Sequence, residues 1–275
     1  MKVAFQGVKG AYSELALYEH FGRQVTSVGL DSFDDVFEAV VEGRVDFGFV
    51  PVENTIAGTV VENYDMLFSN DIFVVAEVFM KIRHTLLAKR GTSFDDIREA
   101  YSHPHALRQC KEFLKKHGIR HMPVYDTAGA AEMVARWERN DRAAIASELC
   151  AEIYGMDVLC KDIQTNKTNT TRFFVIVKEE NRPDDILCEK TSIAFKTRHY
   201  PGALVDCLKI FQEQNLNLTK LESRPIPENP WEYVFYTNFE GGVDSEIVQQ
   251  ALRELENHAL FVKVLGSYPK ASDQW

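Results

Sequence analysis

Short runs of β-branched and aromatic residues alternate with segments of helical period along the first two thirds of the chain. Gly, Ser, Asp or Pro marks each change, and this alternation predicts an α/β protein. The clearest helix follows Ser32, because Asp35 stands three residues later as in a capping box. Its apolar residues fall on one face and predict packing on a sheet: Phe33, Val36, Phe37, Val40 and Val41.

The other elements up to residue 180 follow the same rhythm. We expect strands at Lys2–Gln6, Val25–Val28, Val45–Val50, Ala100–Ser102, Met122–Tyr125, Ala143–Ala146, Asp157–Cys160 and Arg172–Val177. We expect helices at Ser13–Phe21 and Pro104–Lys116, one capped by Thr127, and one from Ser147. The extended run Ile72–Leu87 and the late strand from Arg172 are candidates for crossings between two α/β lobes. Two lobes closing on a cleft would form a ligand site at the strand ends.

A charged segment without periodicity, Lys178–Glu189, separates this part from the rest of the chain. The pattern beyond it predicts the order β-α-β-β-α-β, which is the ferredoxin-like arrangement. The expected strands are Thr191–Phe195, Asn217–Glu222, Trp231–Phe239 and Leu260–Gly266, with helices beginning at Pro201 and capped by Asp244. We therefore predict a domain over 1–180, a linker over 181–189 and a small domain over 190–270, whose edge strands could pair with a second copy.

The composition excludes several classes of protein. The 275 residues are 45% hydrophobic and 26% charged, which is the mix of a folded globular protein and not of a disordered, collagenous or coiled-coil chain. The formal net charge of −10, without a basic patch, argues against nucleic-acid and anionic-membrane partners. Five cysteines without a C-x-x-C pair fit a reducing compartment. No signal or transit segment and no membrane-spanning apolar run is evident, so we expect a cytoplasmic protein.

Polar residues gather at the ends of predicted strands in four segments, where an α/β protein places its site. The first segment, Gln6–Ser13, is a glycine-rich turn whose backbone amides could hold an anion. Its alternative is a tight turn that needs glycine for positive φ. The second segment places Glu53, Asn54 and Thr55 just after an apolar strand, where they could bind a polar ligand. Its alternative is an Asx turn with a helix cap.

The third segment is Ser102–Cys110. Ser102 or His103 can cap the helix that follows, and Gln109 lies on a partly covered face of that helix. His103 and His105 have no third ligand at a suitable spacing, so they do not form a convincing metal pair.

The fourth segment, Asn169–Val175, places the hydroxyl of Thr171 and the guanidinium of Arg172 at the mouth of an apolar strand. An arginine there would orient a carboxylate with two hydrogen bonds, and a structural ion pair is the alternative. The chain shows no nucleophile elbow, P-loop, zinc spacing or dinucleotide fingerprint. These residues indicate a two-lobed protein for a small polar anion, followed by a small module of regulatory type.

Taken together, the four segments resemble the prephenate dehydratase family of phenylalanine biosynthesis, which carries a C-terminal ACT domain. The similar motifs are Thr171-Arg172-Phe173, Glu53-Asn54-Thr55, Ser102-His103-Pro104 with Gln109, and the glycine-rich first loop. Four motifs in order along nearly the whole chain are a specific match. The resemblance implies an α/β fold in which a two-lobed, periplasmic-binding-protein-like catalytic domain precedes a ferredoxin-like βαββαβ ACT domain.

The resemblance implies a carbon–oxygen lyase that converts prephenate to phenylpyruvate, water and CO2, with no cofactor and no metal. Thr171, Glu53 and Asn54 would be the catalytic residues. Thr171 would hydrogen-bond the departing hydroxyl, and Glu53 could be the proton source. The substrate would be bound by Arg172 on a carboxylate, together with Phe173, Thr55, Ser102, Gln109, Lys9 and Ser13.

Two segments of the small domain resemble the paired motifs by which ACT domains of this family bind phenylalanine at a dimer interface. They are Gly202-Ala203-Leu204-Val205 and Glu222-Ser223-Arg224-Pro225. The resemblance implies allosteric control by L-phenylalanine in a homodimer or homotetramer. The alternatives are an ordinary helix-start glycine at Gly202 and a strand end with a turn at Glu222–Pro225.

Four positions depart from the family pattern: Val8 replaces proline, Ala11 replaces threonine or serine, Thr55 replaces serine, and His105 replaces a common glutamine. Three other functions stay open. Arogenate dehydratase performs the same chemistry on an amine in place of the keto group. A solute-binding protein would share the two-lobed cleft without turnover, and an amino-acid sensor would act on a partner.

Overall fold

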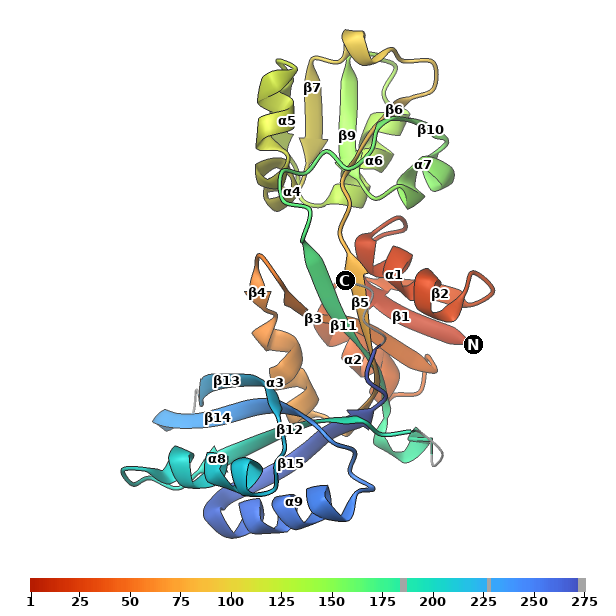
Figure 1. Cartoon of the computed structure of the whole chain (residues 1–275). Coiled ribbons are helices and arrows are strands. Elements are labelled where there is room, and N and C mark those ends of the chain that lie inside the picture. The colour runs from red at the N-terminus through yellow and green to blue at the C-terminus, as the bar shows by residue number, and fades with distance from the viewer. Residues whose placement is uncertain (184–186, 227–228, 272–275) are drawn as a thin grey trace. The chain divides into compact units, whose positions relative to one another are not determined.

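A computed structural model describes residues 1–183, 187–226 and 229–271 (Figure 1). Residues 184–186 of the predicted linker and 227–228 of the predicted small domain lie outside the described residues. The chain forms two compact units. Unit 1 comprises Met1–Val36, Phe49–Thr59 and Phe79–Arg172, and unit 2 comprises Phe37–Gly48, Val60–Val78 and the chain from Phe173 onward.

Unit 1 begins with the predicted strand–helix–strand. Strand β1 (Lys2–Gln6) pairs in parallel with β2 (Thr26–Leu30), and helix α1 (Tyr12–Phe21) connects them. Helix α2 (Phe33–Val41) starts with the expected capping box, because Asp35 N donates to Ser32 Oγ at 3.1 Å and Ser32 N donates to Asp35 Oδ2 at 3.0 Å. The sheet continues through β3 (Phe47–Asn54), which adjoins β1 and β11 (Thr170–Lys178) and pairs with the short β4 (Gly58–Thr59).

A second sheet of unit 1 has the order β10-β6-β9-β7-β8. Its strands are β6 (Thr85–Lys89), β7 (Glu99–Ser102), β8 (Arg120–Pro123), β9 (Arg142–Ala146) and β10 (Met156–Cys160). The helices are α4 (Pro104–Gln109), α5 (Lys111–Lys116), α6 (Thr127–Arg136) and α7 (Leu149–Tyr154), with a 3-10 turn η1 at Phe94–Asp96. Leu86 and Leu87 enter two different cores because strand side chains alternate, so helices cover both faces (Figure 1).

The C-terminal part of unit 2 has the predicted order β-α-β-β-α-β. Its elements are β12 (Lys190–Thr197), α8 (Ala203–Glu213), β13 (Leu218–Ile226), β14 (Asn229–Glu240), α9 (Glu246–His258) and β15 (Ala259–Tyr268). The strand order β13-β14-β12-β15 is antiparallel throughout, which is the ferredoxin-like sheet. Both helices pack on one face of this sheet through a buried core that includes Ile193, Phe195, Phe211, Phe239 and Leu255 (Figure 1).

The rest of unit 2 comes from earlier segments of the chain. It includes helix α3 (Val61–Ser69), most of strand β5 (Ile72–Lys81) and a 3-10 turn η2 at Glu179–Asn181. Strand β15 pairs in parallel with β5 at Gly266 and Val74. Lys263 of β15 caps α3, because its Nζ donates to the carbonyl oxygens of Phe68 at 2.8 Å and Asn70 at 2.7 Å.

Several boundaries differ from the sequence expectation. The strand expected to end at Pro51 continues to Asn54, because Val52 is fully buried and extends the apolar run. The long run Ile72–Leu87 is two strands, β5 and β6, which lie in different sheets, as a crossing between lobes requires. The helix expected over Pro104–Lys116 breaks at Cys110, where φ is −99° and ψ is 8°.

Two predicted helix caps are wrong by one residue. Asp126, not Thr127, caps α6, since its Oδ1 accepts a hydrogen bond from Gly129 N at 2.5 Å. Ser245, not Asp244, stands at the N-cap of α9. A carboxylate one residue earlier satisfies the free amides of the first turn of α6, which explains the shift there.

Candidate active site

Asn54, the last residue of β3, has an orientation that the backbone determines. Its Oδ1 accepts hydrogen bonds from the backbone N–H groups of Ile56 and Ala57, both at 2.9 Å. A backbone N–H can only donate, so the oxygen and the nitrogen of this amide cannot be exchanged. The expected Asx turn is therefore present, and it leaves Nδ2 of Asn54 as a donor toward the neighbouring strand β11.

Nδ2 of Asn54 donates to two side chains at the start of β11. The acceptors are Thr171 Oγ1 at 2.9 Å and Asn169 Oδ1 at 2.8 Å. Asn169 and Thr171 are 2% and 9% exposed, so these bonds are shielded from water. The Glu-Asn-Thr and Thr-Arg-Phe segments, which lie more than 110 residues apart in the sequence, thus meet through the amide of Asn54.

Three further side chains continue these hydrogen bonds away from Thr171. Asn169 Nδ2 donates to Gln109 Oε1 at 2.8 Å, and the same oxygen lies 2.7 Å from His84 Nε2. Nδ1 of His84 lies 2.7 Å from the hydroxyl of Tyr12. We call the connected set the polar network: Tyr12, His84, Gln109, Asn169, Asn54 and Thr171.

The polar network leaves two donors without a partner. Thr171 Oγ1 accepts from Asn54, so its own O–H is available for another acceptor. Oε1 of Gln109 is occupied by Asn169 and His84, which leaves the Nε2 amide hydrogens. Among the described residues neither donor has an acceptor. Two unpartnered donors suit a ligand rich in oxygen atoms and negative charge.

Burial keeps the outer end of the polar network uncharged. Desolvation lowers the pKa of His84, and the hydrogen bond with Gln109 opposes that shift only in part. Desolvation also raises the pKa of Tyr12 well above its usual value. Near neutral pH the imidazole is therefore neutral and the phenol is protonated.

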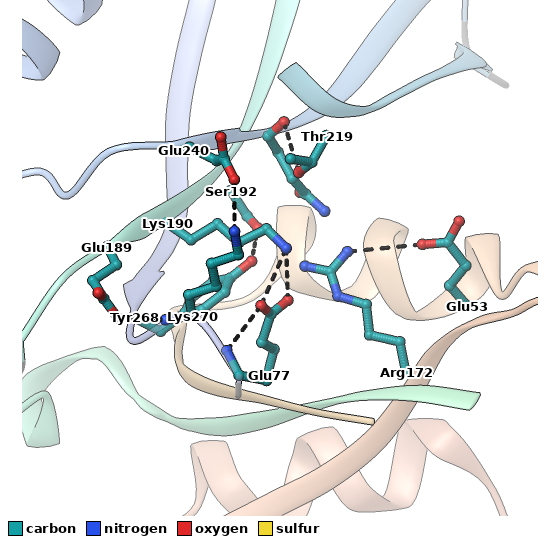
Figure 2. Close-up of polar contacts among 12 residues, drawn as sticks. Glu53, Glu77, Arg172, Glu189, Lys190, Ser192, Thr219, Glu240, Tyr268 and Lys270 are labelled. Atoms are coloured by element: carbon teal, nitrogen blue, oxygen red, sulfur yellow. Dashed lines mark hydrogen bonds and ion pairs between the residues drawn. The ribbon is translucent and has the colours of Figure 1, made fainter. Parts of the chain in front are cut away.

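Arg172 and Glu53 lie on the other face of the same two strands. Side chains alternate along a strand, so Arg172 points away from Thr171 and Glu53 points away from Asn54. Figure 2 shows Nη1 of Arg172 facing Glu53 Oε2, at 3.7 Å. The guanidinium carbon lies 5.8 Å from the centroid of the Phe79 ring. The four residues expected in one centre thus form two pairs, one on each face.

Three predicted substrate-binding residues are either buried in the core or hydrogen-bonded to neighbouring backbone groups. Ser102 is fully buried and its Oγ donates to the carbonyl oxygen of Ile145 at 2.5 Å, which favours a core role. Phe173 is 2% exposed. Thr55 Oγ1 donates to Thr168 O and accepts from Thr170 N, both at 3.0 Å, so it ties the loop after β3 to β11. Gln109 alone of the third segment joins the polar network.

The first loop has the geometry of the tight-turn alternative. Gly10 has a φ of 89°, and a Cβ there would lie 2.5 Å from Cys150 Sγ, so only glycine fits. The N–H of Gly10 donates to Glu14 Oε2 at 2.6 Å and is not available to an anion. Lys9 is exposed and borders a surface hollow of about 330 Å³. Within the described chain, neither Lys9 nor Ser13 makes a side-chain hydrogen bond to the polar network.

The residues expected to bind phenylalanine lie in unit 2. Gly202 is the N-cap of α8 with a φ of 98°, Ala203 is 5% exposed and Val205 is 53% exposed, with Leu204 half-buried between them. Glu222-Ser223-Arg224-Pro225 lie in the second half of β13, which ends at Ile226. Strand β13 is at the sheet edge, where its outer side is open to another strand.

Arg224 contacts helix α3 within unit 2. Its Nε lies 3.1 Å from Asp65 Oδ2. The hydroxyl of Tyr236 donates to the other oxygen of Asp65 at 2.7 Å. This contact raises the pKa of Tyr236, although burial is the larger cause. One carboxylate thus connects α3 with both β13 and β14.

Sequence reasoning missed His84, Tyr12 and Asn169 as members of the site. Asn169 stands two residues before Thr171 and carried a readable signal, since it is a polar residue at the mouth of an apolar strand. Tyr12 and His84 had no such sequence signal, because a tyrosine at a helix start and a lone histidine between apolar strands are common in proteins without any functional role. Over the described residues, no cluster of His, Cys, Asp and Glu could hold a metal ion. No described helix is long and apolar enough to cross a membrane.

Comparison with known proteins gives consistent matches. Residues 3–181 match the family model for prephenate dehydratase. The chain is 42% identical to arogenate dehydratase/prephenate dehydratase 2 of Arabidopsis thaliana, a chloroplastic protein, over 98% of this chain and 73% of that protein. It is similar to the prephenate dehydratase of Arthrobacter aurescens solved in complex with L-Phe (TM-score 0.89, 28% identity, 100% and 91% of the two chains). It is also similar to GqqA, described as a quorum quenching acylase (TM-score 0.91, 31% identity, 98% of both chains).

Proposed function

Because the chain belongs to the prephenate dehydratase family, we propose that it converts prephenate to phenylpyruvate, CO2 and water under the control of L-phenylalanine. One observation carries the catalytic part of this proposal. The amide of Asn54 occupies an acceptor position of Thr171 Oγ1 at 2.9 Å, which leaves the Thr171 O–H to donate to a ligand.

The chemistry of the reaction needs few protein groups. The bond between the ring and its carboxylate breaks, and its electrons move into the ring as CO2 leaves. The ring C–O bond breaks on the opposite carbon, and the hydroxyl leaves as water after taking up a proton. Aromatisation drives both cleavages, so the protein has to position a dianion and stabilise charge on the departing oxygen.

The polar network supplies this stabilisation with neutral donors. The Thr171 O–H would donate to the departing hydroxyl, and Nε2 of Gln109 would donate to a carboxylate oxygen of the substrate. Asn54 would act on the substrate through Thr171 and is a positioning residue in this scheme. Neutral donors suit the step because they bind the developing negative charge without themselves becoming buried ions.

Glu53 and Arg172 have a different place in this proposal. Their location on the opposite face of β3 and β11 favours a role in holding the two strands together over direct contact with the substrate at Thr171. The expectations that Glu53 is the proton source and that Arg172 binds a carboxylate stay predictions. Lys9 and Ser13 likewise stay predicted substrate contacts.

The proposed regulation belongs to the C-terminal module. We assign residues 190–270 as an ACT domain that binds L-phenylalanine between two copies, through Gly202–Val205 and Glu222–Pro225. The βαββαβ order and the open edge of β13 support this assignment. The similar structure from Arthrobacter aurescens, solved with L-Phe, supports the ligand. A homodimer or homotetramer, the domain boundaries and a cytoplasmic location are parts of the same proposal.

Two other activities can be compared with the site. Arogenate differs from prephenate by an amine in place of the keto group, and the matched Arabidopsis protein is named for both substrates. An acylase needs a nucleophile activated by a base. Thr171 Oγ1 accepts from the amide of Asn54, and no described base contacts it. The site therefore favours the dehydratase over the acylase.

The proposal is tested by incubating the purified protein with prephenate and with arogenate, each with and without L-phenylalanine. We expect phenylpyruvate from prephenate, with a higher kcat/KM than for phenylalanine formation from arogenate. Added phenylalanine is expected to change the rate. Absence of turnover with both substrates would refute the catalytic assignment, and turnover that ignores phenylalanine would refute the regulatory one.

A further inference from the structure

His84 lies between β5 and β6, and both its backbone N–H and its carbonyl oxygen are hydrogen-bonded. Its backbone N–H donates to Gln164 Oε1 at 2.8 Å, and its carbonyl oxygen accepts from Ile163 N at 3.1 Å. The residue is 4% exposed. Its ring packs edge-on against Tyr12 with the centroids 5.5 Å apart. Nδ1 of the imidazole thus faces Tyr12 and Nε2 faces Gln109. The role of the ring then depends on which nitrogen carries the proton.

Two backbone amides of the loop after β3 decide where that proton lies. Ile56 N and Ala57 N fix Oδ1 of Asn54, so its Nδ2 must donate to Asn169. Because Asn169 accepts through Oδ1, its Nδ2 is the atom that faces Gln109. Gln109 must therefore accept through Oε1. An Oε1 atom has no proton to give, so the His84 nitrogen at 2.7 Å must donate.

Resting on the proposed function, we propose that His84 is a positioning residue whose Nε2–H, together with Nδ2 of Asn169, holds Oε1 of Gln109 so that this amide presents donors, not an acceptor, to the substrate carboxylate. With the proton on Nδ1 instead, Nε2 would be an acceptor and would draw the amide nitrogen of Gln109 toward itself. The carbonyl oxygen of Gln109 would then face the anionic substrate and repel it. The ring tautomer and the amide of Asn169 thus set the polarity of the site together.

The hydroxyl of Tyr12 fits this tautomer. Its hydroxyl lies 2.7 Å from Nδ1 of His84 and 3.2 Å from the carbonyl oxygen of Arg83. With the ring proton on Nε2, Nδ1 is an acceptor, and the phenol hydrogen can be shared between Nδ1 and the carbonyl oxygen of Arg83. Tyr12 therefore acts on the substrate through His84 and Gln109, without touching it.

Two variants, His84→Gln and His84→Asn, separate this positioning role from a packing role. In His84→Gln the side-chain nitrogen can take the place of Nε2, whereas in His84→Asn the shorter side chain cannot reach Gln109. We expect the KM for prephenate to rise about 10-fold or more in His84→Asn, because a bond to a charged ligand loses its preset donor. His84→Gln should stay within about 3-fold of wild type, and kcat should change little in either variant. His105→Gln, an exposed histidine, is the matched control.

The tautomer is measured directly in the wild-type protein by a 1H–15N spectrum of the histidine rings, with His84 assigned by its loss in His84→Gln. A proton on Nε2 is expected, and a proton on Nδ1 overturns the proposal. Equal KM values for His84→Gln and His84→Asn also overturn it, since a packing role would affect both. If the wild-type protein forms no product, the proposed function fails, while the ring spectrum still tests the tautomer.

Discussion

Thr171 and Arg172 are consecutive residues of β11, yet their side chains serve opposite faces of the sheet. Thr171 accepts a hydrogen bond from Asn54 at 2.9 Å, whereas Arg172 faces Glu53 at 3.7 Å. Neighbouring strands β3 and β11 each contribute one residue to each face. A motif that reads as one unit in the sequence is therefore divided between a hydrogen-bonding face and an ion-pair face.

This division predicts unequal effects for two adjacent threonines. Thr171→Val removes the hydroxyl that we propose donates to the departing oxygen, and we expect kcat to fall about 100-fold or more. Thr170→Val is the matched control, because Thr170 points to the other face and should keep kcat within about 3-fold. Both rates are measured as phenylpyruvate formation at saturating prephenate. Equal rates in the two variants would contradict the assignment of Thr171.

Asn54→Asp tests the polarity of the network. The new carboxylate still accepts from Ile56 N and Ala57 N, but it turns an acceptor toward Asn169 Oδ1, where a donor stood. We expect a loss of about 1–3 kcal/mol in the free energy of unfolding, measured in urea. We also expect a large drop in kcat, because Thr171 would donate its proton to the carboxylate and not to the substrate. Unchanged stability and rate would show that the amide nitrogen is dispensable.

Unit 2 contains a buried ion pair whose loss should be severe. Figure 2 shows the ammonium group of Lys190 (β12) facing the carboxylate of Glu77 (β5). The Nζ–Oε2 distance is 2.9 Å, and the two side chains are 8% and 1% exposed. Glu77→Gln removes the carboxylate that pairs with the buried ammonium group, and we expect the free energy of unfolding to fall by about 3–5 kcal/mol. The double variant Glu77→Leu/Lys190→Met should lose less, because neither member of this buried pair is charged any longer. Urea denaturation of both variants checks this order.

The stability of the protein should depend on pH through His84. Burial lowers the pKa of His84 in the folded state. The unfolded chain then binds a proton more readily, so the free energy of unfolding falls as the pH drops below about 6.5. His84→Gln removes this contribution, and its difference from wild type should shrink toward low pH. Urea unfolding from about pH 7 to pH 5 measures the slope, with His105→Gln as control; parallel slopes for all three proteins would contradict the shift.

The contact between Asp65 and Arg224 predicts an effect on regulation without a large effect on stability. The two side chains are 35% and 44% exposed, so Asp65→Asn should change the free energy of unfolding by about 1 kcal/mol or less. Arg224 belongs to the proposed phenylalanine site and would lose the carboxylate that orients it. We therefore expect the phenylalanine concentration for half-maximal effect to rise severalfold. An unchanged phenylalanine response would separate Asp65 from the regulatory site.

The sequence by itself determined most of the element order, the βαββαβ module and three members of the polar network, but β4, helix α3 and the division of Ile72–Leu87 into β5 and β6 were not predicted. Apolar periodicity is a local property, so strands such as Lys2–Gln6 and helices such as Tyr12–Phe21 are readable without a fold. Asn54 was found because it follows an apolar strand, Thr171 because it stands at the mouth of one, and Gln109 because it lies on a partly covered helix face. Ser102, placed in the site by the same kind of motif, proved to be bonded inside the core.

Only the tertiary structure decided which of these side chains meet and in which direction their hydrogen bonds run. Tyr12, His84 and Asn169 come from three distant segments, and no local pattern links a helix-start tyrosine to a histidine 72 residues later. The backbone amides of Ile56 and Ala57 determine which atoms donate and which accept along the hydrogen bonds that lead to the ring of His84. That direction depends on the donors and acceptors that the fold places next to one another, which sequence spacing does not specify.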